Sequence, residues 1–222
     1  MSQQRVFNFE DGRANDSVVG LDGVEVNLPD TAPTEVKIEY SNCSDSGHLT
    51  FVPSPDPQNE PHSLIYQIPP DQSIKEFSVN GSGLSLQAPP LHQFHTLNVE
   101  TVGRSSNMGK VRSQIVKLST TGSQTDATGL TCEVLHATST GGALLAPAAD
   151  EVSITNVGSQ LSAAVSDSRT ARFSLSNVGG TAKVEVPQNF DGKFSGMAMV
   201  GAISVNGEKL PQSYERPAMG DR

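Results

Sequence analysis

The sequence predicts an all-β protein of one domain, built as a parallel β-solenoid: a β-helix-like stack of about seven rungs of about 20 residues, with an irregular β cap at its N-terminal end. Three observations predict this fold. A short segment of alternating apolar and polar residues recurs between residues 74 and 206. A glycine follows each segment at a nearly constant distance. A second short apolar cluster follows each glycine.

The recurring unit is typical of a strand, a turn and a second strand. Alternation places apolar side chains on one face of a strand, and glycine suits a turn that needs a positive φ. The units start 17 to 21 residues apart and run from Phe77 to Gly83, Leu97 to Gly103, Val116 to Gly122, Leu135 to Gly141, Val152 to Gly158, Phe173 to Gly179 and, one residue longer, Phe194 to Gly201. We expect the second strands around Leu84 and Leu86, Val111, Leu130 and Cys132, Leu144 and Leu145, Leu161 and Val165, Val184 and Val186, and Ile203 and Val205.

One unit of this length cannot enclose a core, so the units must stack and bury their apolar faces together. Successive rungs then lie about 4.8 Å apart, and seven of them extend over roughly 34 Å. Both ends of such a stack need caps that block edge pairing. We expect a flexible arm at 1–20, an N-terminal β cap at 21–73 with a proline-rich loop at 53–62, the solenoid at 74–206, and a C-terminal cap and tail at 207–222.

The amino-acid composition and the net charge argue against several classes of binding partner. The chain has 222 residues, a formal charge of −9, 5% aromatic residues and no Trp. The scarcity of aromatic residues disfavours an aromatic sugar platform and a base-stacking nucleic-acid surface, and the negative charge disfavours polyphosphate and anionic-membrane partners. No run of 18 apolar residues or signal-like apolar segment occurs, so we expect no membrane span and a cytoplasmic protein. The two cysteines, Cys43 and Cys132, are too few for a disulfide framework, and we expect both to be reduced thiols.

The last repeats suggest a family. The run from Ala171 to Gly180, followed by Val184 to Pro187, Phe190 to Gly192 and Gly201 to Val205, resembles adhesin-like β-solenoid repeat proteins of unknown function found in bacteria and fungi. The resemblance covers about residues 74–206. It implies a β-solenoid fold and no particular activity.

Complete catalytic and metal motifs are missing from the sequence. Gly103 to Lys110 departs from a phosphate-binding loop in its spacing and in the valine that follows the lysine. His92 and His95 lack the third and fourth ligands that a zinc site needs. We therefore expect neither a metal nor a cofactor.

Stacked rungs place equivalent residues in columns, and one group of titratable residues stands out there. Two outward columns are expected, at Ser78, Asn98, Lys117, His136, Ser153, Ser174 and Ser195, and at Asn80, Glu100, Ser119, Thr138, Thr155 and Ser176. Glu100, Lys117 and His136 then lie on one face of three consecutive rungs. They would either perform acid/base chemistry or form a solvated face on which Glu100 and Lys117 pair weakly.

Two functions follow from these alternatives. The first is a non-catalytic binding or scaffold protein that presents a Ser/Thr/Asn-rich face to a protein, a glycan or a small molecule. The second is an enzyme of lyase, isomerase or cyclase type that uses Glu100, Lys117 and His136. A homodimer is compatible with either function, because charged and proline-containing ends oppose only open-ended stacking.

Overall fold

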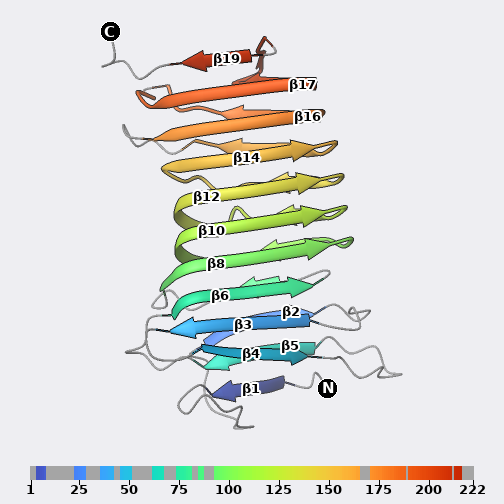
Figure 1. Ribbon diagram of the computed structural model, residues 1–222, viewed down its shortest axis with the longest axis vertical. Coiled ribbons are helices and arrows are strands. Elements are labelled where there is room, and N and C mark those ends of the chain that lie inside the picture. The colour runs from blue at the N-terminus through green and yellow to red at the C-terminus, as the bar shows by residue number, and fades with distance from the viewer. Residues whose placement is uncertain are drawn as a thin grey trace.

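The solenoid fold predicted from the repeats is confirmed. The computed structural model describes residues 4–8, 23–28, 36–42, 46–51, 62–67, 74–81, 85–87, 93–165, 171–188, 190–211 and 213–216. Every regular element among these residues is a β-strand. The strands stack as the rungs of a parallel β-solenoid, with the N-terminal and C-terminal ends of the chain at opposite ends of the stack (Figure 1).

One side of the solenoid is a sheet of long strands, hereafter the long sheet. Its strands pair in parallel in chain order. They are β6 (Ile74–Gly81), β8 (Gln93–Val102), β10 (Val111–Thr121), β12 (Leu130–Thr140), β14 (Glu151–Val157), β16 (Arg172–Glu185) and β17 (Lys193–Val205).

The other side, the short sheet, is formed by the segments that follow the glycine turns. It contains β7 (Ser85–Gln87), β9 (Ser106–Met108), β11 (Gln124–Asp126), β13 (Ala143–Leu145), β15 (Gln160–Ala164) and the second halves of β16 and β17. These segments are also paired in parallel. Each rung therefore contributes one strand to each sheet.

Equivalent residues of successive rungs are direct neighbours, as the repeat spacing predicts. Lys117 of β10 pairs with Asn98 of β8 on one side and with His136 of β12 on the other. The pairing of β16 with β17 is irregular between Asn177 and Gly180: Val178 pairs with Val200, so the register shifts by one residue after Asn177 and shifts back at Gly180, which pairs with Gly201. The ladder skips Gly179 on β16 and Met199 on β17, and the Met199 side chain is 67% exposed.

The core is a continuous stack of apolar side chains between the two sheets. The inward positions of the long sheet are Phe77, Leu97, Val116, Leu135, Val152, Phe173 and Phe194 in one column, and Val79, Val99, Leu118, Ala137, Ile154 and Leu175 in the next. Leu86, Met108, Leu144, Leu161, Ala182 and Ile203 of the short sheet join the same cluster. Near the C-terminal end, Phe173 and Phe194 stack with ring centroids 5.2 Å apart.

Two of the expected second strands are misplaced in the prediction. After Gly103 and Gly122 the chain forms β9 and β11, whereas Val111 and Leu130 begin the next long strands. The strands β9 and β11 were missed because some of their inward side chains carry hydroxyl groups and are not apolar. Ser106 and Thr125 are two such side chains, and both are buried. The second strand expected around Leu144 and Leu145 is β13, in which alternation buries Leu144 and leaves Leu145 43% exposed.

Buried polar side chains form a further inward column beside the turns. This column consists of Thr101, Thr120, Ser139, Asn156 and Asn177. The Asn156 amide donates to Asn177 Oδ1 at 2.6 Å, and the Asn177 amide donates to the Gly180 carbonyl at 2.9 Å. In the earlier rungs the Thr101 hydroxyl contacts the Thr125 hydroxyl at 3.2 Å. If one strand shifted by one residue against its neighbour, these polar groups would lose their partners in the core. The column therefore enforces the register of the strands.

The glycines that define the repeat have the predicted positive φ. Gly103, Gly122, Gly141, Gly158, Gly179 and Gly201 have φ values between 57° and 104°, whereas Gly83 lies outside the described residues. The ladder continues through these turns, since the Gly122 amide donates to the Thr140 carbonyl of the next rung at 2.7 Å. A second position in the turns is constrained by packing: a Cβ on Gly142 would lie 2.1 Å from the Ser123 carbonyl oxygen.

Both ends of the stack are covered by strands that run against the rungs. At the N-terminal end β3 (Val36–Asn42) pairs antiparallel with β6 and with β4 (Ser46–Phe51), while β2 (Gly23–Leu28) pairs antiparallel with β7 and with β5 (His62–Gln67). At the C-terminal end β18 (Glu208–Lys209) and β19 (Ser213–Arg216) pair antiparallel with β17. Reversal of strand direction ends the repeat at both edges.

Other parts of the expected domain plan are only partly described. Within the expected arm at 1–20, Gln4–Asn8 forms β1, which pairs in parallel with β5. The proline-rich loop at 53–62 lies outside the described residues except for His62, the first residue of β5. No helix in the described ranges is long and apolar enough to cross a membrane.

Alanine substitutions at Gly141 and Gly142, two glycines of one turn, should lower the stability of the protein by different amounts. Gly142→Ala places a methyl group against the Ser123 backbone of the adjacent rung, so we expect the free energy of unfolding to fall by about 3 kcal/mol. Gly141→Ala faces open space and pays only for its φ of 57°, about 1–2 kcal/mol. Urea denaturation measures both. Gly141→Asn is the control for the turn and should cost less than Gly141→Ala, because Asn tolerates positive φ. Equal losses at Gly141→Ala and Gly142→Ala would contradict the close packing of the rungs.

Candidate functional site

The outward surface of the long sheet, hereafter the polar face, carries three columns of side chains. The two predicted columns have the predicted register. The third column lies two residues before the first one and consists of Glu76, Thr96, Ile115, Val134, Glu151, Arg172 and Lys193. Sequence reasoning missed it, although its signal is the same alternation extended by one step toward the start of each strand.

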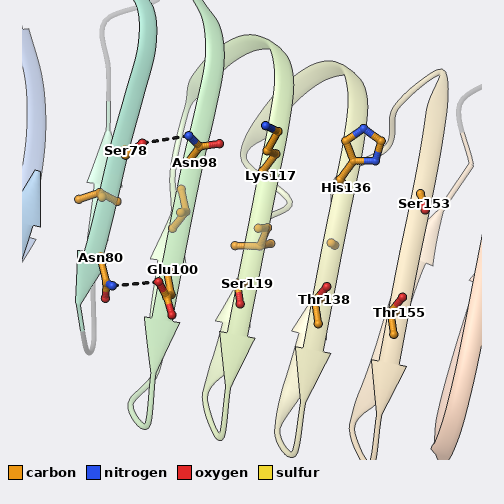
Figure 2. Close-up of a pocket in the computed structure, with 14 residues that line it drawn as sticks. Ser78, Asn80, Asn98, Glu100, Lys117, Ser119, His136, Thr138, Ser153 and Thr155 are labelled. Atoms are coloured by element: carbon orange, nitrogen blue, oxygen red, sulfur yellow. Dashed lines mark hydrogen bonds between the residues drawn. The ribbon is translucent and has the colours of Figure 1, made fainter. Parts of the chain in front are cut away.

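Side chains of neighbouring rungs contact each other along these columns. Asn98 Nδ2 donates to Ser78 Oγ at 2.9 Å and to Glu76 Oε1 at 2.6 Å. Asn80 Nδ2 donates to Glu100 Oε2 at 2.9 Å (Figure 2). The parallel ladder brings equivalent side chains together, so a short amide reaches its neighbour one rung away without bending the strand. The N-terminal part of the polar face is therefore a pre-ordered hydrogen-bonding surface.

Glu100, Lys117 and His136 all lie on the polar face and all are exposed. Figure 2 shows Lys117 and His136 at the same level of adjacent strands, with Glu100 closer to the turns on the strand before them. Glu100 is held by Asn80, its direct neighbour on β6, and no ion pair joins it to Lys117 among the described residues. The expected weak Glu100–Lys117 pair is thus not formed, because the two residues belong to different columns.

Two shallow depressions hollow the polar face. One, of about 540 Å³, includes Glu100, Lys117 and His136 together with the hydroxyls of Ser119, Thr138 and Thr155. The other, of about 760 Å³, lies toward the C-terminal end and is lined by His136, Glu151, Ser153, Arg172, Phe173, Ser174, Lys193, Phe194, Ser195 and Val152. His136 and Ser153 line both depressions, so the two form one track along the stack.

The remaining histidines form no metal centre within the described part of the chain. The His95 ring is hydrogen-bonded to Gln114 Oε1 of the next rung, and His92 lies outside the described residues, as does Cys43. No group of three or more possible metal ligands occurs among the residues that the structure describes. The His92–His95 pair therefore stays an isolated sequence pattern.

Cys132 is half-buried near the start of β12, which makes it unsuited to nucleophilic chemistry. Burial, together with the smaller effect of the Asp150 carboxylate, raises the pKa of the Cys132 thiol to about 12 from its ordinary value of 9.0. The thiolate, which is the reactive form, is suppressed at neutral pH. Cys132 belongs to the packing of the rungs and not to the polar face.

Comparisons with known proteins add no assignment to this geometry. No family model matches the chain, and no curated protein or solved structure matches it either. The resemblance to adhesin-like repeat proteins stays a prediction.

The raised pKa of the Cys132 thiol predicts that it reacts slowly with thiol reagents in the folded protein. In a Cys43→Ser variant, Cys132 is the one remaining cysteine of the chain, and we expect its reaction with Ellman's reagent at pH 8 to be about 1000-fold slower in the folded protein than in urea, because the folded pKa is about 12. The unfolded chain loses its thiol proton near pH 9 and the folded chain only near pH 12, so the free energy of unfolding should fall as pH rises through this window.

The Cys132→Ala variant supplies the control for this pH dependence. Subtracting its unfolding free energies removes the contribution of other groups that ionise above pH 9. A difference between the two proteins that stays constant from pH 8 to 11 would contradict a protonated, buried thiol, and so would fast reaction of the folded protein.

Proposed function

We propose that the protein is a non-catalytic binding protein whose polar face holds a hydroxyl-rich ligand such as a glycan. One observation supports this proposal above all. Equivalent side chains of consecutive rungs form in-register columns of Ser, Thr and Asn on an exposed surface that carries two connected depressions. Hydroxyl and amide side chains both donate and accept hydrogen bonds, which suits a ligand with many hydroxyl groups.

The rigidity of the scaffold supports a binding role. The residues beneath the polar face are buried, and their columns are fixed by the ladder and by the interior Asn156–Asn177 contact. A surface that is ordered before binding loses little conformational entropy when the ligand arrives. Repetition of donors about every 4.8 Å also favours an extended ligand that lies along the stack.

The alternative, an enzyme using Glu100, Lys117 and His136, has weaker support. General acid/base catalysis needs groups that reach the same substrate proton within hydrogen-bonding distance, and electrostatic catalysis gains most where water is excluded. All three side chains are exposed, and Glu100 already accepts a hydrogen bond from Asn80. These features favour recognition of a ligand over its conversion.

A blocking substitution on the polar face tests this proposal. Ser153→Tyr adds a ring at a position that lines both depressions, and we expect it to weaken the binding of glycans on a printed array at least about tenfold. Gln160→Tyr is the matched control, because Gln160 is exposed on the short-sheet side of the same repeat unit. It should bind as the unmodified protein does.

Two results would overturn the binding proposal. One is an unmodified protein that retains none of the glycans on the array. The other is equal binding by Ser153→Tyr and Gln160→Tyr. If bound glycans are instead cleaved, and Lys117→Ala and His136→Ala abolish cleavage but not binding, the enzyme alternative replaces it.

A further inference from the structure

We propose that the track on the polar face binds an acidic, carboxylated glycan chain that lies along the solenoid axis from β10 to β17. This inference rests on the proposed function and names the chemistry of its ligand. It rests on the placement of basic side chains in the two connected depressions and on the hydroxyls between them.

Basic side chains come to the track from four long strands. Lys117 of β10 and His136 of β12 are neighbours in the first column, and Arg172 of β16 pairs in register with Lys193 of β17 in the third. All four are exposed. The depression nearer the C-terminus is lined by Arg172, Lys193 and, among the described residues, one carboxylate, Glu151. The residues that line this depression thus include one more cation than carboxylate, although the formal net charge of the chain is −9.

The length of this basic track favours a chain over a small anion. From β10 to β17 there are four steps between rungs, roughly 19 Å. A single carboxylate or phosphate touches one or two of these side chains at a time. A linear polymer with acidic groups at intervals reaches Lys117 and the Arg172–Lys193 pair together, which multiplies weak contacts.

Serine hydroxyls connect the basic positions. Ser153, Ser174 and Ser195 stand beside Glu151, Arg172 and Lys193 on the same three strands, two residues further along each strand. All three serines line the depression nearer the C-terminus. Sugar hydroxyls can pair with these groups as donors or acceptors, while the acidic groups of the sugar meet the cations.

Nucleic acid fits the same track poorly. Single-stranded binding relies on aromatic platforms for the bases, and the rings that border the depression, Phe173 and Phe194, are 2% and 3% exposed. Acidic side chains also interrupt the face at Glu76, Glu100 and Glu151. The hydroxyl groups of a sugar chain can donate hydrogen bonds to these carboxylates.

The test uses octamers of polygalacturonate and the same octamers with their carboxylates methyl-esterified. We expect the unmodified protein to bind the acidic form at least about tenfold more tightly in calorimetry, and added salt to weaken that binding. The Arg172→Gln/Lys193→Gln variant should lose this preference. The Arg112→Gln/Lys183→Gln variant removes the same charge at two exposed residues that line neither depression, and it should keep the preference.

Each contrary result has a distinct meaning. Equal binding of the acidic and esterified octamers, abolished by Ser153→Tyr, overturns the acidic ligand and leaves glycan binding by the polar face intact. Binding that Ser153→Tyr does not change overturns both. A preference for poly(U) over the acidic octamer, lost in Arg172→Gln/Lys193→Gln, overturns the glycan in favour of nucleic acid. Far-UV circular dichroism of each variant confirms that the fold is retained.

Discussion

The hydrogen-bonded ladder between equivalent residues of successive rungs is the interaction on which the rest of this structure depends. It places Lys117 between Asn98 and His136, and it aligns equivalent residues along the long sheet in the same way, apart from the irregular stretch between β16 and β17. Once that register is set, alternation decides the rest: apolar columns turn inward and polar columns turn outward. The polar face is thus a consequence of the backbone as much as of its side chains.

Two features of the sequence protect this register. The glycines with positive φ let each turn close without moving the next strand, and the small residue at Gly142 lets adjacent turns touch. The buried Asn156–Asn177 contact would be broken by any slip. Because each rung needs both neighbours, the antiparallel strands at the two ends complete the first and last rungs and also end the stack.

Much of this architecture could be predicted because the same sequence pattern recurs in every rung. The alternation around Phe77 or Leu135 and the spacing to the glycines were enough to give the long strands and two outward columns. The short strands β9 and β11 were not found, since they bury hydroxyls such as those of Ser106 and Thr125. The Thr125 hydroxyl pairs with those of Thr101 and Ser123 inside the solenoid, and hydrophobic patterns cannot detect such pairs. The cap strands lack the repeat, so their pairing with β6 and β7 had no signal in the spacing.

The site was only partly predictable for a related reason. Glu100, Lys117 and His136 were placed correctly in their columns, but their contacts depend on side-chain reach, and Glu100 reaches Asn80 and not Lys117. Arg172 and Lys193 belong to a column that sequence reasoning did not follow. The overall charge of −9 argued against an anionic ligand. That argument does not apply to a single site, because the net charge of a chain contains no information about which charged residues share one face.

A crystal structure of the protein with a bound polygalacturonate octamer would test the central claim most directly. The account predicts an extended sugar chain along the polar face from β10 to β17, with carboxylates beside Lys117 and beside Arg172 and Lys193. An octamer that lies on the short sheet, in the turns or across the end of the stack would contradict it.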